Sequence, residues 1–137
     1  MPFSRTLPVT IGDINYGQHM GNDRFLAFFH EARLGYLASL GNDRGAALSE
    51  ANIGDGVGLI MTNANITYLA QVAHGDSLII TVTPGECAKA SFELLYEALR
   101  ASDGKAAARG STKLCAFDYA RQRIARLPES FLGKLQK

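Results

Sequence analysis

The sequence has little that would support a metal site, a disulfide framework or a catalytic thiol. Its 137 residues include no tryptophan, four prolines and two cysteines, Cys87 and Cys115. The two cysteines are too few and too far apart for a metal-binding motif. Each lies in a strand-like stretch, which favours buried free thiols in a reducing compartment. We therefore expect no metal and no disulfide.

Charge and hydrophobicity are also not concentrated in any one part of the chain. The 14 Lys and Arg residues nearly balance the 13 Asp and Glu residues, for a net charge of +1, so we expect no nucleic-acid partner and no acidic membrane surface. The apolar runs fall far short of the roughly 20 residues of a membrane span. Residues 1–12 lack the apolar stretch of a secretory signal. The sequence predicts one cytoplasmic domain over residues 1–137.

The strongest periodic signal covers residues 22–40. Asn22 is the expected N-cap and Gly41 the expected stop of a long helix. Apolar side chains recur at the i, i+3, i+4, i+7 spacing of a core-facing face; they are Phe25, Leu26, Phe28, Phe29, Ala32, Tyr36, Leu37 and Leu40. The width of this face predicts a helix that lies in the core.

Period-two alternation and turn signals account for most of the remaining chain. Asp103-Gly104 is the strongest hairpin signal, and short helices are expected within 42–53 and over 127–135. Strands are expected over residues 5–11, 57–70, 77–83, 90–102 and 105–119. A long helix followed by hairpin-linked strands predicts an α+β domain with an antiparallel sheet around the helix. Hairpin links exclude a doubly wound parallel sheet.

The loop before the predicted helix, residues 12–21, is dense in Asp, Asn, Gly and His. Asp13 or Asp23 with His19 is a candidate acid/base pair. Asn15 is a candidate to orient water or to donate to an oxyanion, beside the unpaired N–H groups at the helix start. Alternatively, these residue types are present because they form turns and caps. The sequence alone leaves both interpretations open.

Several polar residues elsewhere are weaker candidates. Glu31, on the polar side of the helix, either faces solvent or points into a cleft. Asn63 and Asn65 share one face of a strand and either line a polar cleft or face water. Lys89 is one of several isolated basic residues that either contact phosphates of a thiol carrier or are simply solvated.

The order of elements and several motifs resemble the hotdog-fold thioesterases of the 4-hydroxybenzoyl-CoA thioesterase-like group, over nearly the whole chain. Members read D-x-D, then H-x-x-N and an aromatic residue at the entry to a central helix that often contains E-A-R. The matching residues here are Asp13-Ile14-Asn15, His19, Asn22, Phe25 and Glu31-Ala32-Arg33.

This resemblance implies a five-stranded antiparallel sheet wrapped around one long central helix. It also implies a homo-oligomer, a dimer or a dimer of dimers, with the acyl cleft between subunits. The implied activity is hydrolysis of an acyl-CoA or acyl-carrier thioester, with coenzyme A entering only as part of the substrate and no other cofactor. The expected catalytic residues are Asp13, Asn15, His19, Asn22, Asp23 and Glu31, and the expected substrate-binding residues are Tyr16, Met20, Gly21, Asn63, Asn65 and Lys89.

One departure from the family pattern lies at the site itself. The second acidic residue of D-x-D is usually the catalytic carboxylate, and this chain has Asn15 there. An amide accepts no proton and is a poor nucleophile. Either another carboxylate acts with His19, or His19 activates water that Asn15 positions, or the protein binds acyl thioesters without hydrolysing them.

A second hotdog branch, the (R)-specific enoyl-CoA hydratases, also competes. Its members carry G-D-x-N followed by a proline and a histidine. Gly12-Asp13-Ile14-Asn15 matches the start of that motif, but the proline is missing and His19 falls one residue late. H-x-x-N therefore favours the thioesterase branch.

Overall fold

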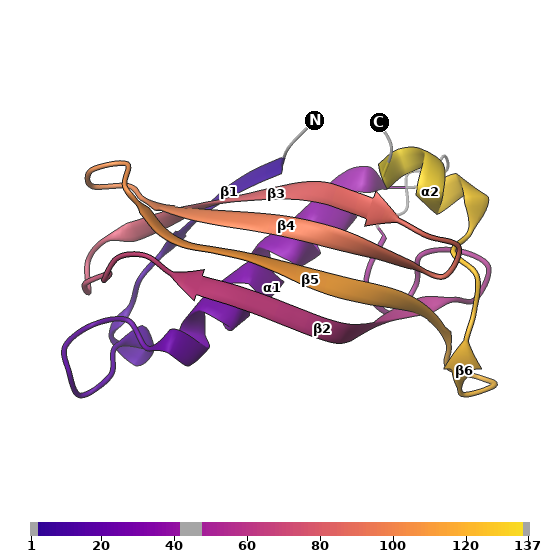
Figure 1. The fold of residues 1–137 in the computed structure, drawn as a ribbon, viewed down its shortest axis with the longest axis horizontal. Helices are drawn as coiled ribbons and strands as arrows, with labels where there is room; N and C mark the ends of the chain where they lie inside the picture. The colour runs from indigo at the N-terminus through magenta and orange to yellow at the C-terminus, as the bar shows by residue number, and fades with distance from the viewer. Residues whose placement is uncertain (1–2, 42–47, 136–137) are drawn as a thin grey trace.

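The computed structural model describes residues 3–41 and 48–135, in which a curled antiparallel sheet covers one long helix (Figure 1). The helix is α1 (Asn22–Leu40). The other elements, in chain order, are β1 (Phe3–Pro8), the 3-10 turn η1 (Ile11–Asp13), β2 (Gly58–Tyr68), β3 (Ser77–Cys87), β4 (Ser91–Arg100), β5 (Ala106–Asp118), β6 (Arg123–Ile124) and α2 (Glu129–Leu135).

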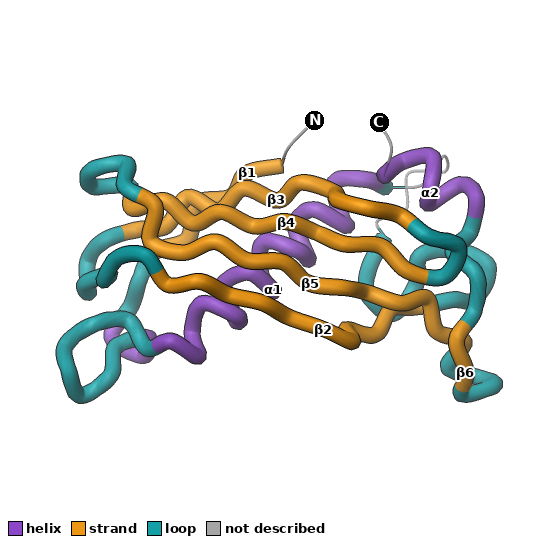
Figure 2. The backbone as a smooth tube through the Cα atoms, viewed as in Figure 1, coloured by secondary structure: helices purple, strands orange, loops and turns teal. Residues whose placement is uncertain are grey.

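The strands are arranged in the order β1-β3-β4-β5-β2, and the two-residue β6 adds to β5. All pairings are antiparallel. Strands β3, β4 and β5 follow one another through hairpins, whereas β2 reaches the far edge beside β5, as Figure 2 shows. The sheet confirms the predicted architecture, and β2 and β1 are its two edges.

Helix α1 crosses the concave face of this sheet (Figure 1). Gly21 is its N-cap and Asn22 its first residue, so the N-cap lies one position earlier than the expected Asn22. Gly41 follows the last turn with φ of 52°, a conformation that favours glycine. Most of the predicted apolar face is buried, and Leu26 and Leu40 are half-buried.

The core lies between α1 and the inward-facing residues of the sheet. Leu78, Ile80 and Val82 of β3 have no exposed surface, and they alternate with outward-facing residues as expected for a sheet with one covered face. On β4, Tyr96 stacks on Phe29 of α1 with ring centroids 4.8 Å apart. Burial of such side chains stabilises the fold by roughly 1.5–3 kcal/mol each.

Three bulges or register shifts interrupt the regular ladders. One lies between Met61 and Asn63 in β2, so the strict alternation expected over residues 57–70 changes phase there. A second lies between Pro84 and Cys87, and β3 continues through it instead of ending at Thr83. The third lies between Ala98 and Leu99, where β4 pairs with β5.

The short helix expected within 42–53 is not present over its described part. Residues 42–47 lie outside the described residues, and Ser49 and Asn52 form an isolated bridge. The predicted C-terminal helix is confirmed as α2. No helix among residues 3–41 and 48–135 has the length and apolar character to span a membrane.

Candidate functional site

A cavity of about 330 Å³ opens at the N-terminal end of α1. One wall comes from the loop after η1 and from the first turn of the helix. The other wall comes from the end of β2 and the segment that follows it. The lining residues are Asn15, His19, Met20, Asn22, Phe25, Tyr68, Leu69, Ala70, Gln71 and Val72.

A tight turn brings Asn15 and His19 to this cavity together. The amide of Asn15 donates to the carbonyl of His19 at 2.9 Å, and Gln18 between them has φ of 67°. Oδ1 of Asn15 accepts the N–H of Gly17 at 2.9 Å, which is an Asx turn. Asn15 lines the cavity, and its side-chain NH2 has no acceptor among the residues that the structure describes. Turn formation and a role at the site are thus compatible for Asn15.

The backbone amides near the helix start fall into two groups, those of Met20 and Gly21 and those of Asn22 and Asp23. The amide of Met20 donates to Val72 O at 2.8 Å and that of Gly21 to Asp13 O at 3.0 Å. This corrects the expectation that the amides of Met20 and Gly21 are free to hold a substrate oxygen. Within the described part of the chain, no acceptor is found for the amides of Asn22 and Asp23, which occupy the first two positions of α1. Unpaired amides at a helix start favour a negatively charged oxygen.

Asp13 is buried and its carboxylate is fully engaged elsewhere. Oδ2 accepts the backbone N–H and the hydroxyl of Thr10 at 2.9 and 3.1 Å, and Oδ1 pairs with Nε of Arg24 at 3.0 Å. Burial opposes ionisation, but the hydrogen bonds from Thr10 and Arg24 outweigh it and lower the pKa of Asp13. Asp13 lines a separate cavity beside β1 and the outer face of α1. The geometry therefore assigns it to capping η1 and tethering Arg24.

The remaining candidate residues do not line the cavity at His19. Glu31 is exposed and lines the same outer cavity as Asp13. Asp23 is exposed at the helix start, where a Cβ on Gly21 would lie only 2.7 Å from its Oδ1. Tyr16 is fully exposed at the tip of the loop.

The strand candidates also lie elsewhere. Asn63 and Asn65 pair with Lys113 and Ser111, on the outer face of the sheet. Lys89 is exposed in the hairpin that joins β3 to β4, at the opposite end of the sheet from the α1 N-terminus (Figure 1). A role for these residues in substrate binding stays a prediction.

Sequence reasoning missed Tyr68 and Val72, which form the second wall. Tyr68 donates a hydrogen bond from its hydroxyl to the carbonyl of Asn22 at 3.0 Å. Its ring meets Phe25 edge to face, with centroids 5.5 Å apart. Val72 accepts the amide of Met20. The available signal was the period-two alternation of residues 57–70, which places Tyr68 on the same face as Ile66 but does not indicate which loop the end of the strand contacts.

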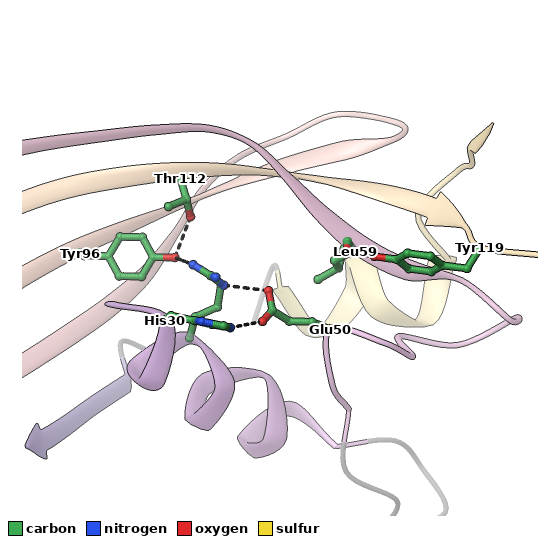
Figure 3. A network of polar contacts seen from close by, with 7 residues as sticks. His30, Glu50, Leu59, Tyr96, Thr112 and Tyr119 are labelled. Carbon is green, nitrogen blue, oxygen red and sulfur yellow. Dashed lines mark hydrogen bonds and ion pairs between the residues drawn. The ribbon is translucent and has the colours of Figure 1, made fainter. Parts of the chain in front are cut away.

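A second feature that sequence reasoning missed is a buried polar network around Arg33, the arginine of E-A-R (Figure 3). Arg33 is 4% exposed. Its guanidinium donates to Oε2 of Glu50 at 3.1 Å and to the hydroxyl of Tyr96 at 3.2 Å. The Tyr96 hydroxyl also bonds Thr112, and His30 contacts the other oxygen of Glu50 at 2.5 Å. The network fixes the segment before β2 against the middle of α1.

Comparisons with known proteins identify the class to which this fold and site belong. Residues 9–135 match the model of the thioesterase-like superfamily. The chain therefore belongs to the thioesterase-like superfamily, and its fold is the hotdog fold predicted from the sequence. No curated protein matches the chain by sequence.

Solved structures with the same fold include three that cover nearly all of this chain. A 1,4-dihydroxy-2-naphthoyl-CoA thioesterase from Synechocystis has a TM-score of 0.86 at 24% identity, over 100% of this chain and 97% of its own. A Staphylococcus aureus protein solved in complex with CoA has a TM-score of 0.86 at 20% identity, over 99% and 82%. A DHNA-CoA thioesterase from Staphylococcus aureus has a TM-score of 0.82 at 18% identity, over 96% and 85%.

The cavity is lined by residue types that can serve acyl transfer to water. They are the imidazole of His19, the side-chain amide of Asn15 and, at the helix start, Asn22 with its unpaired backbone N–H. The cavity has no carboxylate among its lining residues. Within the described residues, no group of three or more His, Cys, Asp or Glu side chains is placed to hold a metal ion.

Proposed function

We propose that the protein hydrolyses the thioester of an acyl-CoA or an acyl-carrier protein at the His19 cavity. The observation that carries this proposal is that His19, the side chain of Asn15 and Asn22, whose backbone N–H has no acceptor among the described residues, line one cavity. Membership of the thioesterase-like superfamily supports the reaction class. The Staphylococcus aureus structure in complex with CoA supports coenzyme A as the thiol carrier.

In the proposed reaction, His19 takes a proton from a water molecule as the water oxygen attacks the thioester carbonyl. The carbonyl electrons move onto oxygen, and the backbone N–H of Asn22 at the helix start stabilises that oxyanion. The NH2 group of Asn15 orients the water or the carbonyl. The carbon–sulfur bond then breaks, the thiolate takes the proton from His19, and the products are a carboxylic acid and a free thiol.

The experiment follows thiol release with a colorimetric reagent over short, aromatic and long acyl-CoAs. We expect His19→Ala to lower kcat/KM about 100-fold or more, the range for loss of a general base. Asn15→Ala is expected to lower kcat more than it raises KM. The matched control is His74→Ala, because His74 is exposed in the turn before β3 and does not line the cavity. Hydrolysis that survives in His19→Ala would contradict the assigned role.

A binding function without hydrolysis is the second candidate, and one observation favours it. The cavity lining contains no carboxylate, since Asp13 and Glu31 line another cavity and Asp23 lies outside. This function predicts saturable binding of acyl-CoA without thiol release. It also predicts that Asn15→Asp, which restores the family's carboxylate, creates hydrolysis. The hydratase alternative is less favoured because it needs Asp13 and His19 at one cavity.

We also propose that the protein acts as a homodimer or a dimer of dimers. Strand β2 is an 11-residue edge strand with mostly exposed side chains. Its sequence, GLIMTNANITY, has none of the charges or prolines that usually protect an edge from pairing with another chain. The mass in solution, measured by light scattering, tests this: a monomer at micromolar concentration would contradict it.

A further inference from the structure

Tyr68 joins the end of β2 to the first turn of α1 across the cavity. Its hydroxyl donates to the backbone carbonyl of Asn22, and its ring packs edge to face on Phe25, one turn further along the helix. Two independent contacts thus hold one side chain in place, although 45% of its surface is exposed. A side chain fixed at both its ring and its hydroxyl is a wall with a defined position.

Apolar residues of β2 and α1 lie next to Tyr68 and Phe25 along the two elements. Ile66 is the next inward-facing residue of β2, and it packs against the core. Phe29 follows Phe25 by one helical turn, and both Phe29 and Ile66 approach Gly110 of β5. The residues that follow Phe25 on α1 and precede Tyr68 on β2 toward the core are therefore apolar. We expect truncation of Tyr68 to extend the cavity toward them.

The size of the cavity limits what it can hold. Its volume of about 330 Å³ lies at the small end of ligand pockets, which range from roughly 300 to 1,000 Å³. An apolar cavity of about 150 Å³ holds one benzene molecule. The cavity thus has room for a ring-sized or short acyl group with its thioester, and Tyr68 stands where a longer chain would continue.

We propose that Tyr68 is the specificity-determining residue of this site and that it restricts the acyl group to a single ring or a short chain. This inference rests on the proposed function in that the ligand is an acyl thioester. It does not rest on hydrolysis, because a wall excludes a long chain from a binding site as well as from a catalytic one.

The test measures binding of CoA thioethers, which resemble the thioester substrates but cannot be hydrolysed. The S-ethyl, S-benzyl, S-octyl and S-hexadecyl derivatives are titrated by calorimetry into wild type and Tyr68→Ala. We expect wild type to bind the benzyl or ethyl derivative best. In Tyr68→Ala the ratio of octyl to benzyl affinity should rise about tenfold or more, as for other changes in the size of an apolar pocket. Tyr68→Phe keeps the ring and should keep the wild-type ratio.

The chain offers a closely matched control in Tyr119. Tyr119 is 46% exposed and donates a hydrogen bond from its hydroxyl to the carbonyl of Leu59, a residue of β2 like Tyr68. Its ring meets Phe117 edge to face, with centroids 5.0 Å apart. It lines a different cavity, with Glu50, Ala51 and Leu59. Tyr119→Ala removes comparable contacts and should leave the ratio unchanged. An equal change in Tyr119→Ala and Tyr68→Ala would overturn the proposal.

The remaining outcomes separate this inference from the proposed hydrolysis. If wild type releases no thiol from any acyl-CoA but the thioether ratio changes as expected, hydrolysis fails and the role of Tyr68 stands. An unchanged ratio in Tyr68→Ala, or no binding of any thioether, overturns the role of Tyr68. If Tyr68→Ala does not fold, Tyr68→Trp provides the opposite test, because a larger ring should weaken benzyl binding relative to ethyl binding. An unchanged ratio of benzyl to ethyl affinity in Tyr68→Trp would contradict the proposal.

Discussion

Arg33 and Glu50 form an ion pair, with Nε and Oε2 3.1 Å apart, that joins the middle of α1 to the segment leading into β2. Arg33 is buried, whereas about a quarter of the Glu50 side chain is exposed. The same segment is held again where the amide of Leu59 donates to the carbonyl of Glu50 at 2.7 Å. The start of β2 is therefore positioned by α1 itself.

We expect Glu50→Gln to destabilise the fold, because it leaves the buried guanidinium of Arg33 without its countercharge. Breaking a fully buried pair costs about 3–5 kcal/mol, and the partial exposure of Glu50 reduces this to about 2 kcal/mol. Urea unfolding followed by circular dichroism measures the change. The control is Glu31→Gln, which changes an exposed carboxylate on α1, the helix that carries Arg33. This variant should change stability by less than about 0.5 kcal/mol. Equal stabilities of the two variants would contradict a structural role for the pair.

The Tyr96 hydroxyl is expected to matter more than the hydroxyl it bonds. It accepts from Arg33 at 3.2 Å and lies 2.7 Å from the Thr112 hydroxyl. Tyr96→Phe leaves both neighbours short of a partner in the core, at a cost of about 1–3 kcal/mol. Thr112→Val removes one hydroxyl while Arg33 still bonds Tyr96, so its cost should be smaller. The same unfolding measurement on both variants would contradict this order if Thr112→Val proved the less stable.

The parts of the fold that were predictable from the sequence are those encoded by local spacing. The face of α1 that carries Phe25 and Phe29 follows from helical periodicity, and Asp103-Gly104 does lie between β4 and β5. Asn15 and His19 were identifiable as a pair because they lie four residues apart in one turn. Local signals therefore gave one wall of the cavity.

The rest depends on residues that are distant in sequence. Tyr68 meets Asn22 across 46 positions, and Arg33 meets Tyr96 across 63, so no pattern within one element indicates either contact. The bulge at Met61 and Asn63 changes the phase of β2, which alternation alone cannot predict. Arg24 likewise bonds Asp13 across 11 positions, between the first turn of α1 and η1. These contacts are products of packing.

Asp13 gives the fold a dependence on acid. The hydrogen bonds from Thr10 and Arg24 outweigh the effect of burial and hold the pKa of Asp13 below its ordinary value of 3.8. A lowered pKa in the folded state means that ionised Asp13 stabilises the fold above about pH 3.8, and that this contribution is lost as the pH falls through the folded-state pKa. Asp13→Asn should therefore be less stable than wild type at pH 7, by about 1–2 kcal/mol as for loss of a capping residue.

The difference between Asp13→Asn and wild type should shrink as the pH falls below about 3.8. Urea unfolding at pH 7, 5 and 3 measures it. Glu86→Gln, which changes an exposed carboxylate on β3, serves as the control and should follow wild type at all three values. A difference for Asp13→Asn that is the same at pH 7 and pH 3 would show that the carboxylate charge plays no part.

Gly110 is a position in β5 where the core leaves no room for a side chain. A Cβ there would lie 2.5 Å from the backbone oxygen of Asn65 and 3.0 Å from the ring of Phe29. Neither neighbour can move easily, because one is main chain in the paired strand and the other is buried under the sheet. We expect Gly110→Ala to lower the free energy of unfolding by about 1–3 kcal/mol, as overpacking of a core does.

Gly133 in α2 is the matched control, since a Cβ there meets nothing within 4 Å. Gly133→Ala should stabilise the protein by up to about 1 kcal/mol. Thermal unfolding of the two variants separates these effects, and a Gly110→Ala protein as stable as wild type would mean that β2 and α1 lie further from β5 than this packing allows.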